Sequence, residues 1–142
     1  MVSKEFLIEH IDQNEQIVEE IISLLKKFKI FTFQAEMGAG KTTLIHSILK
    51  CLKVQHFDGS PTYSIINEYV SPERGKIYHL DLFRLNSIKE AYDIGIEEIF
   101  SEKNIIFIEW PEILSSFLKD ENVVHVFINV IESKSRKFEI VF

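Results

Sequence analysis

Cysteine is almost absent from the sequence, since Cys51 is the only one among 142 residues. A single thiol excludes an internal disulfide and a zinc site built from thiolates, and it agrees with a reducing compartment. No apolar stretch approaches the ~20 residues that a membrane-spanning helix needs, because the longest one, residues 123–131, contains His125 and Asn129. No apolar secretory segment follows the first residues either. We therefore expect a cytoplasmic protein that has no membrane partner.

Positive charge is also scarce. The 16 Lys and Arg against 22 Asp and Glu give a formal net charge of -6. A field of this sign does not draw the chain onto nucleic acid, so contact with RNA must be local or made through a partner. The length and the 46% hydrophobic content are typical of one compact domain over residues 1–142, whose core accounts for the 12 Phe.

The hydrophobic periodicity predicts alternating helices and strands. Asp12 followed by Glu15 is typical of a capping box before a helix over about 13–28. The strand at 104–110 is apolar on both faces, which favours the middle of a sheet covered on both sides. The order of elements predicts an α/β fold, P-loop NTPase-like and three-layered, with a mixed parallel and antiparallel central sheet. The other strands are expected at 30–35, 62–70, 76–83, 123–132 and 136–142. The other helices are expected at 44–52, from Ser87 until Gly95 breaks the helix before residues 96–100, and at 112–119.

Two of the five glycines lie in one short segment, Ala-Glu-Met-Gly-Ala-Gly-Lys-Thr at 35–42. This is the phosphate-loop pattern with Ala35 in place of its first glycine. Ala35 can take that place if its φ is negative, whereas Gly38 and Gly40 leave the backbone N–H groups open to an anion. A predicted strand precedes the segment and a predicted amphipathic helix follows it. The context favours a phosphate site over a simple glycine turn with a solvated lysine.

Within this pattern, Lys41 supplies a positive charge for phosphate and the Thr42 hydroxyl is placed for magnesium. A metal-binding carboxylate is expected at the end of a neighbouring apolar strand. Glu109 and Asp81 each end such a strand, and Glu109 fits better. For both residues the alternative is a surface carboxylate or one paired with a lysine.

Trp110 and Thr62 are two further candidates. Trp110 follows Glu109 where the chain leaves the sheet, and its alternative is core packing. Thr62 lies where nucleotide switches keep a hydroxyl that senses the γ-phosphate. Its alternative is a turn that begins at Ser60-Pro61.

Four segments in this order resemble the TsaE family, small bacterial P-loop ATPases that serve threonylcarbamoyladenosine formation on tRNA. Residues 36–43 resemble its phosphate loop and residues 60–63 its switch segment. Tyr-His-Leu-Asp-Leu-Phe-Arg-Leu at 78–85 and Ile-Glu-Trp-Pro at 108–111 resemble two further signatures. The chain departs from the family at Ala35 and at Phe83, where the family has tyrosine, so a hydroxyl at position 83 is not essential here.

The resemblance implies a magnesium-dependent ATPase that acts with the TsaB–TsaD heterodimer and meets tRNA only through that complex. The tRNAs concerned read codons that begin with adenosine. Thr42 and Glu109 are the implied magnesium ligands, and Asp81, Glu109, Thr62 and Trp110 the residues implied in hydrolysis. The implied ATP contacts are His10, Ile11, Glu36, Met37, Gly38, Ala39, Gly40, Lys41, Thr42, Thr43, Ser133 and Arg136.

Two other functions remain open. A small-molecule kinase would need several arginines around both phosphates, and the chain has only Arg74, Arg84 and Arg136. The second open function is a docking module, in which bound ATP orders a surface for a partner and is not hydrolysed. A GTP switch is disfavoured, because no asparagine is followed by lysine and the guanine-reading Asn-Lys-x-Asp motif is therefore absent.

Overall fold

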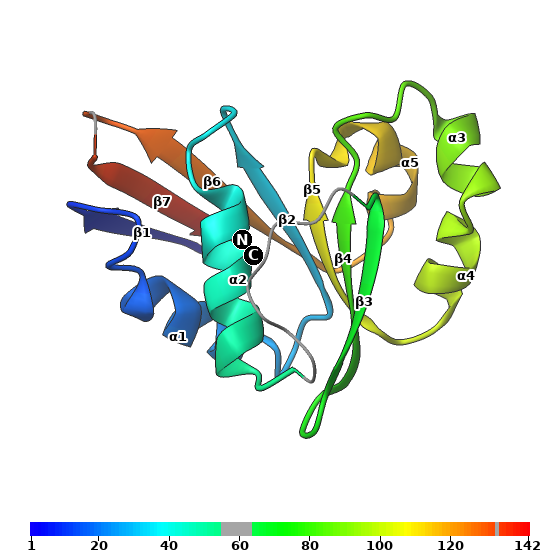
Figure 1. The fold of residues 1–142 in the computed structure, drawn as a ribbon, viewed down its shortest axis with the longest axis horizontal. Coiled ribbons are helices and arrows are strands. Elements are labelled where there is room, and N and C mark those ends of the chain that lie inside the picture. Colours follow the sequence, from blue (N-terminus) through cyan, green and yellow to red (C-terminus); the bar gives the residue numbers. More distant parts are fainter. Residues whose placement is uncertain (55–63, 133) are drawn as a thin grey trace.

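The computed structural model describes residues 1–54, 64–132 and 134–142 (Figure 1). In chain order the elements are β1 (Ser3–Ile8), α1 (Glu15–Leu24), β2 (Ile30–Ala35), α2 (Lys41–Cys51), β3 (Ile66–Ser71), β4 (Gly75–Asp81), α3 (Ile88–Asp93), α4 (Ile96–Ser101), β5 (Ile105–Glu109), the 3-10 helix η1 (Pro111–Leu114), α5 (Ser115–Leu118), β6 (Val123–Val130) and β7 (Arg136–Val141).

The strands form one seven-stranded sheet in the order β1-β7-β6-β2-β5-β4-β3. The four inner strands β6, β2, β5 and β4 are parallel, whereas β3, β7 and β1 pair antiparallel with their neighbours. The predicted mixed sheet is therefore confirmed. β5 is buried at every residue, as its apolar sequence on both faces predicted.

Side chains alternate between two cores, one on each face of the sheet. On β2 and β5, Phe31, Phe33 and Phe107 join the core beneath α1 and α2. Ile106 and Ile108 point the other way, into the core that α3, α4 and α5 cover. Figure 1 shows the helices on the two faces. These three layers match the prediction, and each fully buried side chain contributes about 1.5–3 kcal/mol to the burial free energy.

The N-terminal segment differs from the expectation. Residues 3–8 carry no predicted element, yet they form β1 by pairing with β7 at the far end of the chain. The predicted capping box at Asp12 is wrong, because α1 begins at Glu15 with Asn14 at its N-cap position and no side-chain cap. The Asn14 amide instead donates to Ser47 Oγ on α2 at 3.0 Å, so it joins the two helices.

The later elements follow the predictions, apart from their ends. The Ser87 hydroxyl caps α3 by accepting the Glu90 N–H, as the sequence indicated. The helix expected at 112–119 is η1 followed by the single turn of α5. Residues 62–63 of the expected strand at 62–70 lie outside the described residues, and β3 begins at Ile66. No helix in the described part of the chain combines the length and the apolar character needed to cross a membrane.

Candidate functional site

Residues 36–40, here called the glycine loop, connect the end of β2 to the start of α2. Gly38 has φ +79° and Gly40 has φ +111°, both in the left-handed region that favours glycine. Ala35 ends β2 as an ordinary strand residue without a positive φ. This is the condition under which alanine can stand where the pattern has its first glycine.

Lys41, the first residue of α2, is only 6% exposed and reaches back over the glycine loop. Its Nζ donates to the Ala35 carbonyl at 2.9 Å and lies 3.9 Å from the centre of the Trp110 ring. Burial lowers the pKa of the Lys41 ammonium, and the negative charges of Glu109 and Asp81 oppose that shift. A cation held between a carbonyl and a ring face has donors to offer to an incoming anion.

Glu109 ends β5 beneath the start of α2, and both of its carboxylate oxygens have partners. The Thr42 hydroxyl donates to Oε1 at 3.3 Å, and His79 Nε2 lies 2.6 Å from Oε2. His79 and Glu109 are 1% and 3% exposed. His79 lies in the segment at 78–85 that resembles a family signature, but no role was predicted for it from the sequence. The signal was its place two residues before Asp81, which faces Glu109 in the parallel pairing of β4 with β5.

A cavity of about 260 Å³ opens at this edge of the sheet. It brings together residues from the glycine loop, α2 and the ends of β4 and β5, as predicted for parallel strands that end at one edge. Asp81 lies at its wall, where its Oδ1 accepts the Phe83 N–H at 3.2 Å. The lining residues are Met37, Gly38, Gly40, Lys41, Thr42, Thr43, Asp81, Phe83, Glu109 and Trp110.

Trp110 has φ +57° and stands between the sheet and η1. Its ring packs against Phe83 with 5.0 Å between ring centres, and it covers Lys41 on the side of the cavity. Trp110 therefore lines the site and also packs against a neighbouring side chain. Polar groups at the cavity include the Thr42 hydroxyl and the carboxylates of Glu109 and Asp81. They are hard oxygen donors, which are the ligands that Mg²⁺ prefers.

Other predicted contacts lie behind the glycine loop rather than in the cavity. Ala39 is buried, and its carbonyl accepts a hydrogen bond from Arg136 Nε at 2.8 Å. Arg136 therefore holds the loop from β7. Glu36 is exposed, so its carboxylate points to solvent. Thr62 and Ser133 lie outside the described residues.

The segment before α1 also packs on the glycine loop. A Cβ added to Gly40 would lie 2.6 Å from Ile11 Cγ1, so the Ile11 side chain closes directly on this residue. His10 is occupied locally, since its Nδ1 lies 3.2 Å from the Asp12 N–H. Contact of His10, Ile11 or Arg136 with ATP stays a prediction.

The two loop glycines are expected to respond differently to alanine. Gly40→Ala should lower the free energy of unfolding by about 2–4 kcal/mol, because the new Cβ is strained by its φ and overlaps Ile11. Gly38→Ala meets nothing within 4 Å and has only the backbone strain, about 1–2 kcal/mol. Urea unfolding measures both values. Equal losses would contradict the close contact with Ile11, and adding Ile11→Ala should relieve part of the Gly40→Ala defect.

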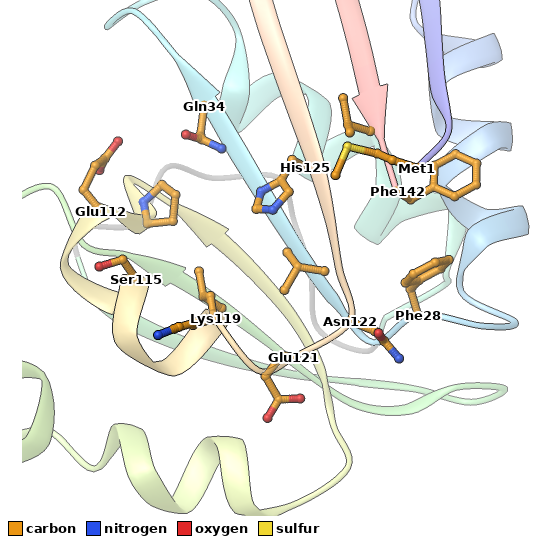
Figure 2. Close-up of a pocket in the computed structure, with 14 residues that line it drawn as sticks. Met1, Phe28, Gln34, Glu112, Ser115, Lys119, Glu121, Asn122, His125 and Phe142 are labelled. Atoms are coloured by element: carbon orange, nitrogen blue, oxygen red, sulfur yellow. The ribbon is translucent and has the colours of Figure 1, made fainter.

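A larger cavity of about 550 Å³ lies on the face of the sheet that is turned away from α2, between β6 and α5 (Figure 2). His125 and Gln34 lie at its floor, and the Thr32 hydroxyl lies 2.7 Å from His125 Nδ1. Burial lowers the pKa of His125. None of the predicted site residues that the structure describes lines this cavity, and its wall is largely apolar, without a glycine loop to receive phosphate.

Comparison with known proteins agrees with the fold and the motifs. The crystal structure of YdiB from Bacillus subtilis superposes with a TM-score of 0.72 over 98% of this chain and 84% of that one, at 18% identity. The fold is therefore the one seen in YdiB. TsaE from Aquifex aeolicus is 33% identical over 84% of this chain and 90% of its own length, and TsaE from Borreliella burgdorferi is 35% identical over 74% and 76%.

Residues 8–138 match the sequence model of the family described as threonylcarbamoyl adenosine biosynthesis protein TsaE. The chain belongs to the TsaE family. Its members act in the biosynthesis of threonylcarbamoyladenosine in tRNA, and the resemblance seen in the sequence is confirmed.

Proposed function

We propose that this protein binds ATP with Mg²⁺ at the glycine loop and hydrolyses it in support of threonylcarbamoyladenosine formation on tRNA. The observation that carries the proposal is the convergence of Lys41, Thr42 and Glu109 on one cavity at the N-terminus of α2. The loop amides and the helix terminus favour an anion there. The cation and the oxygen donors at the same place suit a nucleotide phosphate with its metal.

Each side chain then has a definite task. Lys41 would bind phosphate, exchanging its contact with Trp110 for the ligand. Thr42 and Glu109 would hold the magnesium ion, which when bound neutralises charge on the β- and γ-phosphate oxygens. Asp81, at the wall of the cavity, would position the attacking water or the ligands around it.

We expect slow hydrolysis by the isolated protein and acceleration by the TsaB–TsaD heterodimer in the cytoplasm. Phosphoryl transfer often uses an arginine supplied in cis or by a partner. The chain has three arginines, and Arg136 already donates to Ala39 in the glycine loop. The same scarcity argues against a small-molecule kinase.

Single-turnover hydrolysis tests this proposal. ATP turnover is measured for the protein alone, with saturating TsaB–TsaD, and with TsaB–TsaD, tRNA and an activated threonylcarbamoyl donor, and threonylcarbamoyladenosine is assayed in the tRNA. The proposal predicts faster turnover with the partner and a modified tRNA. Equal rates would show a self-sufficient ATPase, whereas partner binding without turnover would support the docking module.

Thr42→Ala separates the metal from the phosphate contacts. Because its hydroxyl is assigned to magnesium, the loss of ATP affinity should be about tenfold or more in magnesium and small in EDTA. Calorimetry in both buffers measures the difference. Thr43→Ala, one residue further along α2, is the matched control and should lack this magnesium dependence. An equal loss in both buffers would contradict a metal-bound Thr42.

A further inference from the structure

The contact between His79 and Glu109 lies in the core beneath α2, behind the cavity rather than in it. The distance of 2.6 Å between His79 Nε2 and Glu109 Oε2 is that of a short hydrogen bond. An ionised carboxylate can only accept, so His79 Nε2 carries the hydrogen. His79 does not line the cavity and has no assigned task in the proposed function.

The second ring nitrogen of His79, Nδ1, bears on the role of the imidazole. Among the described residues, His79 Nδ1 is buried without a hydrogen-bond partner. A polar ring in an apolar core is unfavourable unless its hydrogen bonds are made, and His79 makes one, to Glu109. A residue needed only for packing at this point of β4 would be apolar, like Ile77 on the same face.

The hydrogen bond from His79 also fixes the orientation of the Glu109 carboxylate. The terminal torsion of a glutamate is broad, so a free carboxylate at the end of β5 would rotate. With Oε2 held by His79, the second oxygen, Oε1, accepts the Thr42 hydroxyl at 3.3 Å, and Thr42 and Glu109 both line the cavity. The two contacts come from different elements, one from β4 and one from α2.

We infer that His79 is the positioning residue for Glu109: its Nε2–H holds Oε2 and thereby presents Oε1, beside the Thr42 hydroxyl, to the magnesium ion of the nucleotide. The inference rests on the proposed function for the identity of the metal. Outer partners of metal-binding carboxylates set metal affinity by orienting the ligand. His79 therefore acts through Glu109 and touches neither metal nor nucleotide.

The test measures ATP binding by calorimetry at increasing magnesium concentration. Wild type, His79→Ala and His79→Gln are compared. His79→Ala should raise the magnesium concentration at half-saturation by roughly ten- to a hundredfold and change ATP affinity in EDTA little. Glutamine carries an N–H near the position of Nε2, so His79→Gln should restore most of the magnesium affinity. His125→Ala, which removes a hydrogen-bonded histidine from the other face, is the matched control and should match wild type.

A magnesium curve for His79→Ala that superposes on wild type would overturn the inference, as would equal defects in the alanine and glutamine variants. If wild type itself shows no magnesium-dependent ATP binding, the proposed function fails first. The hydrogen bond is tested separately by imidazole ¹⁵N NMR of the nucleotide-free protein, which also applies if His79→Ala does not fold. We expect a hydrogen on His79 Nε2 that is protected from exchange in wild type and unprotected in Glu109→Ala. A hydrogen on Nδ1 alone would overturn the inference.

Discussion

Lys41→Ala is expected to weaken ATP binding by roughly ten- to a hundredfold while leaving the fold intact. A hydrogen bond to a charged group contributes about 1.5–3 kcal/mol, which corresponds to that range. The Lys41 ammonium already lies at the glycine loop, where it contacts the Ala35 carbonyl and the Trp110 ring. Truncation therefore removes the principal cation of the cavity. Isothermal calorimetry with ATP and Mg²⁺ measures the affinity.

Lys76→Ala is the matched control for this experiment. Lys76 also lies over an aromatic ring, 5.9 Å from the centre of Tyr78, but it belongs to the β3–β4 hairpin and pairs with Glu68. Its loss should leave ATP affinity unchanged. Because Trp110 is the only tryptophan, its fluorescence reports whether ATP displaces Lys41 from the ring. Unchanged affinity in Lys41→Ala would contradict the phosphate site.

Glu109→Gln is expected to lower turnover by about 100-fold or more and to shift the magnesium dependence to higher concentration. The amide keeps the shape and can still accept the His79 N–H, but it removes the charge that balances the metal. Hydrolysis rates across a magnesium titration separate the two effects. A variant that hydrolyses ATP at the wild-type rate would contradict Glu109 as a ligand.

Asp81→Asn is the comparison for Glu109→Gln, since both residues end adjacent strands at the same cavity. We expect it to lower turnover with little effect on the magnesium curve. If Asp81→Asn alone shifts that curve, the roles of the two carboxylates are reversed.

The central part of the fold could be predicted because its signals are local. The apolar run of β5 and the glycine pattern before α2 each specify an element within a few residues, and both are confirmed. The carboxyl ends of parallel strands then meet at one edge, so the meeting of Glu109, Asp81 and the glycine loop also followed.

The parts that were missed depend on contacts between distant segments. β1 is a largely exposed edge strand, and it forms by pairing with β7. Asp12 was expected as a cap from spacing alone, whereas Asn14 takes the N-cap position and its side chain reaches Ser47 on α2. The role of His79 depends on its hydrogen bond to Glu109 on another strand, and that of Arg136 on its hydrogen bond to the Ala39 carbonyl in the glycine loop. No periodicity in the sequence reports such pairs.

A crystal structure with a non-hydrolysable ATP analogue and Mg²⁺ tests the central claim most directly. We predict density for the β- and γ-phosphates on the amides of the glycine loop, with Lys41 turned from Trp110 to phosphate and the metal between Thr42 and Glu109. Nucleotide density in the larger cavity beside His125, with the glycine loop unchanged, would contradict the proposed site.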